Sequence, residues 1–176
     1  LMLTAMWVLL PAELVSTGGL PVAEHWKVYL PALLLSFVVM VPAIVLAERH
    51  ARMKLVFNGA IVLLLVVQVG FGALSAGLYG LAGWLMLFFV AFNILEATQP
   101  SLISRLAPPH AKGAALGVYN TTQALGLFLG GVCGGVLAKF AGPGAVWLGG
   151  ALLTLVWLML GLTMSMPPLR ARQAAH

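Results

Sequence analysis

The sequence predicts an all-α integral membrane protein with six transmembrane helices, the first of them truncated. Hydrophobic residues make up 62% of the 176-residue chain and charged residues only 7%, whereas soluble domains are about 45–50% apolar. The mean hydropathy is +1.07. No stretch alternates polar and apolar residues as the strands of a membrane β-barrel do. The spanning segments are therefore expected to be helices, which satisfy their own backbone hydrogen bonds in lipid.

The predicted helices are the apolar runs, since crossing a hydrocarbon core of ~30 Å takes about 20 residues. The first run, residues 1–15, is too short, and we interpret the chain as a fragment that begins inside a membrane helix. The other five runs cover residues 26–47, 55–75, 78–103, 113–138 and 144–164. Residues 1–166 would then form one six-helix bundle and residues 167–176 a cytoplasmic tail.

Lysine and arginine are distributed unevenly between the two ends of this bundle. The gaps after the second and fourth helices, together with the tail, hold seven of the nine basic residues: Arg49, Arg52, Lys54, Arg105, Lys112, Arg170 and Arg172. Only Lys27 and Lys139 fall at the other end. Cytoplasmic loops of membrane proteins are enriched in Lys and Arg, so we expect the C-terminus and the start of the first helix to be cytoplasmic.

Several functional classes are not supported. The pI is near 9.9, but the basic residues form no stripe with stacking aromatics, so nucleic-acid binding is rejected. The one cysteine, Cys133, permits no disulfide within the chain, leaves too few ligands for a zinc site, and is expected to be a small buried hydrophobe. There is no nucleophile–base constellation, Walker loop or dinucleotide fingerprint. We therefore expect neither an enzyme nor a bound cofactor.

The most informative residue is Glu96, an acid in the apolar stretch FVAFNILEATQPSLISR, which covers residues 89–105. Burying a charged side chain in a bilayer costs about 2.5–3.5 kcal/mol on insertion scales, so intramembrane acids usually face a cavity or a partner. Glu96 is therefore a candidate proton carrier. The alternative is structural: a neutral or amide-bonded Glu96 would hold the fourth helix to the fifth.

Three amides are expected to surround Glu96. Asn93 lies one helical turn before it on the same face. Asn120 lies about seven residues into the fifth helix, which matches the depth of Glu96 in the fourth, and Gln123 follows one turn later.

Pro100 lies four residues after Glu96 and cannot donate a hydrogen bond to the Glu96 carbonyl, so a kink is expected there. Thr98 and Ser101 are expected to satisfy part of the freed backbone.

Glycines in the fifth helix recur at four-residue spacing and favour close helix packing, because a stripe without side chains lets another backbone approach. These glycines are Gly113 and Gly117, then Gly126, Gly130 and Gly134, and finally Gly131 and Gly135. The stripe predicts a helix–helix seam and not a ligand site.

The turn AERHARMK after the second helix combines one acid with three bases. The positive-inside rule accounts for Arg49, Arg52 and Lys54 but not for Glu48. Glu48 is expected either to pair with Arg49 or Arg52, in a contact that breaks and re-forms as helices move, or to be simply solvated. Exposed ion pairs contribute little to stability.

Six helices, this charged turn and a glycine-rich fifth helix resemble the C-terminal half of a major facilitator superfamily transporter. The segment FNILEATQPSLISRLAPPHAKGAALGVYNTTQALGLFLGG is similar to the region of the tenth and eleventh helices in the YajR-like, drug:proton antiporter type. The resemblance covers nearly the whole chain. Glu48-Arg49-x-x-Arg52 is similar to the family's interdomain charge motif, Asp-Arg-x-Gly-Arg-Arg, with Glu in place of Asp and Met53 interrupting the basic run.

This resemblance implies half of a twelve-helix carrier of the bacterial inner membrane, built from two inverted three-helix repeats. It implies proton-coupled efflux of small amphipathic compounds by alternating access. The implied partners are the lipid bilayer, a missing N-terminal six-helix half, a small-molecule substrate and protons. Glu96 would take up the proton, while Asn93, Asn120 and Gln123 shape its surroundings. A uniporter or importer of a small polar metabolite and a non-transporting membrane scaffold remain alternatives.

Overall fold

The computed structural model describes residues 2–16, 18–49, 52–73 and 77–164; the predicted tail at 167–176 lies outside them. The described residues form six α-helices and one short 3-10 turn, with no strand: α1 (Met2–Ser16), η1 (Val22–Glu24), α2 (Trp26–Arg49), α3 (Met53–Ala73), α4 (Leu78–Leu106), α5 (Lys112–Ala141) and α6 (Pro143–Thr163). The all-α prediction is confirmed. Each helix end lies within three residues of its predicted position, and α4 and α5 both run three residues further than expected.

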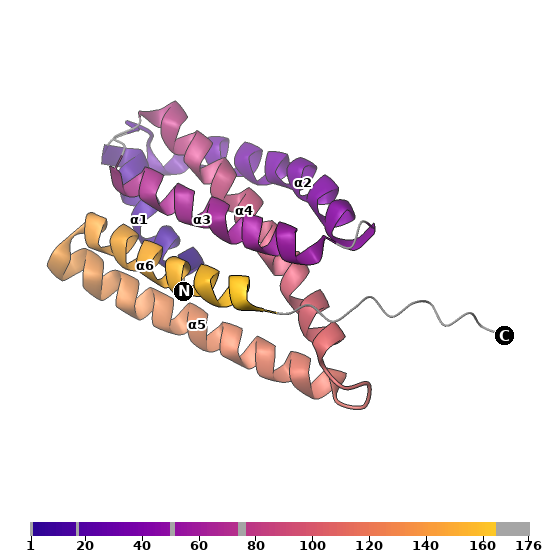
Figure 1. Cartoon of the computed structure of the whole chain (residues 1–176). Helices are drawn as coiled ribbons and strands as arrows, with labels where there is room; N and C mark the ends of the chain where they lie inside the picture. The colour runs from indigo at the N-terminus through magenta and orange to yellow at the C-terminus, as the bar shows by residue number, and fades with distance from the viewer. Residues whose placement is uncertain (1, 17, 50–51, 74–76, 165–176) are drawn as a thin grey trace.

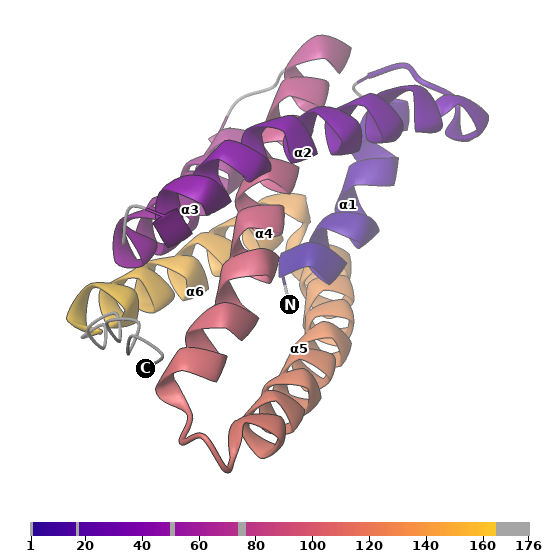
Figure 2. The same ribbon diagram turned by 90° about the vertical axis from the view of Figure 1, so that its right-hand side faces the viewer.

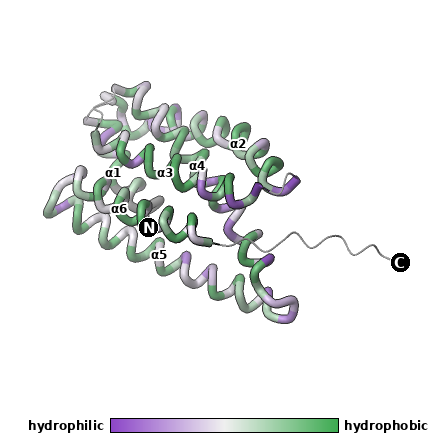
Figure 3. The backbone as a smooth tube through the Cα atoms, viewed as in Figure 1, coloured by the Kyte–Doolittle hydropathy of each residue, from purple (hydrophilic) through white to green (hydrophobic). Residues whose placement is uncertain are grey.

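The helices have the length and composition of membrane spans. Five of them, α2 to α6, are long and apolar enough to cross a bilayer, whereas α1 has 15 residues. The helix bodies are hydrophobic, and hydrophilic residues gather toward the end of the bundle that holds the α2–α3 and α4–α5 connections (Figure 3). Large apolar side chains are exposed along α2, α5 and α6, as lipid-facing surfaces require.

The helices are arranged in two layers. On one face of the bundle, α3 and α6 lie side by side (Figure 1); in the view turned by 90°, where that face points to the left, α4 lies in the middle and α1 and α5 lie to the right (Figure 2). In the second layer, α2 packs on α4 and α5 packs on α1.

This contact pattern repeats between the two halves of the chain. Exchanging α1–α3 for α4–α6 maps the α2–α4 contact onto the α5–α1 contact, and the α2–α3 contact onto the α5–α6 contact. Two inverted three-helix repeats produce such a pattern. The α3–α4 contact is more extensive than its counterpart between α6 and α1, because α1 has 15 residues and α4 has 29.

The core lies along α3 and α4, which carry most of the buried side chains, including Phe88 and Leu85. Gly70 of α3 allows a close approach to α4: a Cβ atom there would lie 2.5 Å from Cζ2 of Trp84. Close packing of small against large residues is how membrane helices associate without a hydrophobic driving force.

Polar contacts tie α3 to α6 on the opposite side. Gln68 Nε2 donates to Thr154 Oγ1 at 2.8 Å inside the bundle. Near the C-terminal end of α6, Lys54 Nζ donates to the Leu162 carbonyl at 2.8 Å, which gives one otherwise unpaired terminal carbonyl a partner. The buried amide of Gln68 therefore has a structural role at this seam.

Candidate functional site

Glu96 of α4 is bound by Gln123 of α5. The two helices are antiparallel neighbours, and Gln123 Nε2 donates to Glu96 Oε1 at 2.5 Å. Both side chains are half-buried. A glutamine amide carries a donor and an acceptor, so after an amide flip it can also accept a hydrogen bond from a protonated carboxyl group. The pair therefore suits both protonation states of Glu96.

Of the three amides expected around Glu96, the structure brings only Gln123 to it. Asn93 turns toward α2, where its Nδ2 donates to Ser36 Oγ at 2.8 Å. Asn120 is exposed on α5 and forms no hydrogen bond with a described side chain. The depth match was one turn off because α4 continues to Leu106, which moves the level of Glu96 along α5 from Asn120 to Gln123.

A second polar pair, which the sequence analysis missed, lies one turn away. Tyr119 Oη donates to Gln99 Oε1 at 2.8 Å. Gln99 follows Glu96 by three residues and Tyr119 precedes Gln123 by four, so both pairs fall on the facing sides of two antiparallel helices. That spacing was the available signal.

A cavity of about 260 Å³ lies between α3, α4, α5 and α6. Glu96, Gln99, Gln123 and Thr154 provide its polar groups, and the remaining lining is mostly apolar. An adjacent cavity of about 310 Å³ shares Gln99 and Trp157 with it and extends toward Leu106, near the α4–α5 connection. Glu96 is thus linked by cavities and polar groups to the basic end of the bundle.

Pro100 does not interrupt α4, which remains helical from Leu78 to Leu106. The hydroxyl groups near it have other partners than expected. Thr98 Oγ1 donates to the carbonyls of Ile94 at 2.7 Å and Leu95 at 3.3 Å, as helical threonines commonly do. The expectation that the Thr98 hydroxyl satisfies the backbone carbonyl freed by Pro100, that of Glu96, is wrong.

Glu48 pairs with α4 and not with its own turn. Its Oε1 lies 3.4 Å from Nη2 of Arg105 and accepts a hydrogen bond from Ser101 Oγ at 3.2 Å. The expected pairing with Arg49 or Arg52 is wrong in the described residues, where both arginines are exposed. The charged turn is therefore fastened to the end of α4 within this half of the fold.

The basic residues separate by end as expected. Arg49, Arg52, Lys54, Arg105 and Lys112 lie at the end that holds the α2–α3 and α4–α5 connections, while Arg170 and Arg172 lie outside the described residues. At the opposite end, Lys27 pairs with Glu24 at 2.9 Å and Lys139 lies 5.3 Å from the ring centroid of Phe140.

The glycine stripe on α5 divides into two faces. Gly130 and Gly134 are buried and Gly126 borders the Glu96 cavity. A Cβ atom at Gly131 or Gly135 would have no neighbour within 4 Å, so these two belong to an open face. Cys133 is exposed, contrary to the expected burial, because it lies off the strip of α5 that carries the buried Gly130 and Gly134.

Three comparisons with curated proteins place the chain among membrane transporters. It is 43% identical over 169 residues to the inner membrane transport protein YajR of Escherichia coli, covering 96% of this chain and 37% of that protein. It is 31% identical over 113 residues to the uncharacterized transporter BU466 of Buchnera aphidicola, covering 64% and 29%. It is 28% identical over 162 residues to the multidrug resistance protein MdtH of Aeromonas salmonicida, covering 89% and 38%. The chain belongs to the major facilitator superfamily.

No protein-family model matches the chain. It spans less than two fifths of the length of these three relatives. Its six helices form half of the twelve-helix major facilitator fold, in which each half contains two inverted three-helix repeats. Among the described residues, no three His, Cys, Asp or Glu side chains gather as a metal site.

Proposed function

We propose that the chain is part of a secondary active transporter of the bacterial inner membrane that exports small amphipathic compounds in exchange for protons. The observation that carries the proposal is the half-buried Glu96, held by Gln123 at the edge of a cavity in a major facilitator half. An ionisable group inside a membrane bundle is costly and usually serves a proton or substrate path.

The surroundings of Glu96 support proton binding. The polar groups that line the cavity near Glu96 are amides and a hydroxyl. Gln123 donates a hydrogen bond to Glu96 from an uncharged side chain, so this contact does not hold the carboxyl group in its ionised form as a cation would. A carboxyl group that is not locked in an ion pair can gain and lose a proton as its cavity opens and closes. A structural acid would more often be paired with a cation.

A route for the proton is suggested by the two adjacent cavities. Gln99 borders both of them, and Tyr119 donates to Gln99 from α5. In the proposed orientation, the basic end and the C-terminus face the cytoplasm, as the distribution of Lys and Arg favours. Protons would then pass between Glu96 and the cytoplasm by way of Gln99 and Tyr119.

The principal alternatives are import or uniport of a small polar metabolite and a non-transporting scaffold. A polar substrate would call for several polar side chains along α1 and α2. The described part of α2 buries only one, Ser36. This apolar character favours an amphipathic substrate.

Transport by the full-length carrier in proteoliposomes tests the proposal, with a panel of uncharged and cationic amphipathic dyes as probes. We expect a pH gradient to drive dye accumulation in wild-type vesicles. Glu96→Gln keeps the size and hydrogen bonding of the side chain but cannot titrate. This variant should lose gradient-driven accumulation while retaining dye exchange at equal pH.

The matched control is Glu13→Gln, because Glu13 lies at the other end of the bundle and accepts a hydrogen bond from Trp147 at 3.3 Å. Its gradient-driven accumulation should equal that of the wild type. Gradient-driven accumulation by Glu96→Gln at the wild-type level would refute the proton role. Transport of polar metabolites without any dye transport would support the importer or uniporter.

A further inference from the structure

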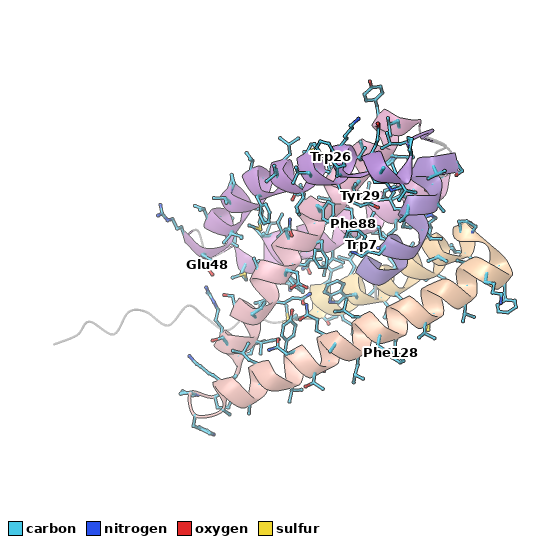
Figure 4. The ribbon with its side chains drawn as sticks, turned by 180° about the vertical axis from the view of Figure 1, so that it is seen from behind. Trp7, Trp26, Tyr29, Glu48, Phe88 and Phe128 are labelled. Atoms are coloured by element: carbon cyan, nitrogen blue, oxygen red, sulfur yellow. The ribbon has the colours of Figure 1, made fainter. Side chains whose placement is uncertain are left out.

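A second pocket, separate from the Glu96 cavity, lies where α1, α2 and α4 meet. Its volume is about 410 Å³. Leu30 and Leu33 of α2 line part of the pocket. The rest of the lining is aromatic, apart from one amide: Trp7, Trp26, Tyr29, Phe89, Phe92 and Asn93. In the view from behind, Trp7, Tyr29 and Trp26 lie close together where α1 meets α2, whereas Phe128 lies apart on the outer side of α5 (Figure 4).

The rings offer flat surfaces to a ligand. Trp7 and Tyr29 are stacked, with ring centroids 5.2 Å apart and planes inclined by 10°. Trp7 is 51% exposed and Trp26 is 60% exposed, so neither ring is used up by packing within this half. Stacking and edge-to-face contacts with a further ring are the favoured interactions of such surfaces.

Two polar atoms at this pocket have no partner among the described residues. The Tyr29 hydroxyl is buried and forms no hydrogen bond. Asn93 donates through Nδ2 to Ser36, which leaves its Oδ1 without a described donor. Pockets for small molecules typically combine apolar walls with a few such polar groups, which fix the orientation of the ligand.

Among the described residues, those that line this pocket include no acidic or basic side chain. Glu96 borders the other cavity, and Phe92 is the one residue that lines both. Aromatic faces also attract cations, but the described lining has no carboxylate that could act as a counter-ion, so an uncharged ring system is the better match.

We propose that this pocket binds an uncharged planar aromatic group of the transported compound, in a compartment that Phe92 separates from the proton site at Glu96. The inference rests on the proposed transport function and specifies its substrate site. Protons and substrate would then be coupled through the helices, in particular through α4, and would not compete for one carboxylate.

Binding of 1-aminoanthracene, a planar arylamine that is uncharged at neutral pH, tests this inference with the purified full-length carrier in nanodiscs. Its saturable fluorescence gives a Kd. Trp7→Leu and Tyr29→Leu should each raise the Kd at least tenfold, and Tyr29→Phe, which removes only the hydroxyl, should raise it about threefold, or ~0.6 kcal/mol. The Kd for Glu96→Gln should stay within twofold of the wild type.

Phe128→Leu is the matched aromatic control, because Phe128 is 66% exposed and lies outside this pocket. Its Kd should be unchanged, and an unchanged Tm for Trp7→Leu and Tyr29→Leu shows that these variants fold. An unchanged Kd in folded Trp7→Leu and Tyr29→Leu would overturn the proposal. So would displacement of the probe by tetraethylammonium, a cation without a ring, or a tenfold weaker Kd in Glu96→Gln.

The binding assay requires no pH gradient, so its outcome is independent of the proton-coupling test. If Glu96→Gln transports normally while the aromatic variants lose binding, the pocket stands and the proton role of Glu96 fails. If coupling depends on Glu96 while the aromatic variants bind normally, the pocket fails alone.

Discussion

Tyr119 and Gln99 extend the polar network of Glu96 by one helical turn toward the basic end of the bundle. The hydroxyl of Tyr119 is the only group in the Gln99 pair that can release a proton and accept another. In the proposed path, Tyr119 lies at the adjacent cavity, where a proton would pass on its way to or from Glu96.

Tyr119→Phe should slow gradient-driven transport several-fold and leave dye exchange at equal pH unchanged, because only proton movement uses the hydroxyl. Parallel measurement of the two rates in proteoliposomes checks this. Tyr79→Phe is the control, since Tyr79 is 92% exposed at the start of α4. Equal loss of both rates would show that Tyr119 supports the fold and not the proton path.

The ion pair between Glu48 and Arg105 makes a different prediction. Its side chains are 48% and 35% exposed, so the pair should contribute only ~0.2–1 kcal/mol. Glu48→Arg should slow transport by up to about fivefold, the equivalent of ~1 kcal/mol, and Glu48→Arg with Arg105→Glu should restore it. Transport rates of the three proteins check this prediction.

The Glu24–Lys27 pair at the opposite end supplies the control for this series. Reversing Glu24 to Arg should leave the transport rate unchanged. A double reversal at positions 48 and 105 that is slower than either single change would contradict a direct pairing.

Single residues show how far the sequence could predict the candidate site. Glu96 could be singled out because an acid in an apolar run is costly wherever the helices lie. The hydrogen-bond partner of Glu96 could not be predicted. The predicted end of α4 was about one turn too early, and an error of that size is enough to select Asn120 in place of Gln123. Arg105 was hidden as a partner of Glu48 because they are 57 residues apart, and only the packing of α2 on α4 brings them together.

At the scale of the elements, helix positions were predictable to within three residues, because apolar length decides where a span begins and ends. Helix neighbours were not. The sequence marked the glycines of α5, of which Gly130 and Gly134 are buried, but it gave no such signal for Gly70 of α3, which has no glycine at four-residue spacing and still lies against Trp84 of α4.

Gly70→Ala should weaken the α3–α4 contact, because the new Cβ atom would lie 2.5 Å from the Trp84 ring. Overpacking of this kind costs about 1–3 kcal/mol and should lower the Tm of the carrier in detergent. Gly83→Ala is the control, since a Cβ atom there has no neighbour within 4 Å. In the double variant Gly70→Ala with Trp84→Leu, the leucine is smaller than the tryptophan that the new Cβ atom would meet. The Tm of this double variant should lie above that of Gly70→Ala alone, and a Tm that is no higher would mean that the strain arises at another contact.

At the scale of the whole molecule, the separation of basic residues predicts one orientation in the membrane. His110→Cys, in the α4–α5 connection, should resist a membrane-impermeant maleimide added to intact cells. Ala141→Cys, at the end of α5, should react, because the two positions lie at opposite ends of the bundle. Labelling in a Cys133→Ser background checks this, and the reverse pattern would invert the proposed topology.

The central claim is that Glu96 exchanges a proton for substrate, and proton movement driven by a substrate gradient tests it most directly. Weakly buffered proteoliposomes that contain the full-length carrier are given an outward gradient of a dye that it transports, and a pH indicator inside the vesicles reports the protons that enter. Wild type and Glu13→Gln should take up protons as the dye leaves. Glu96→Gln should move the dye without proton uptake; proton uptake equal to that of the wild type would contradict the account.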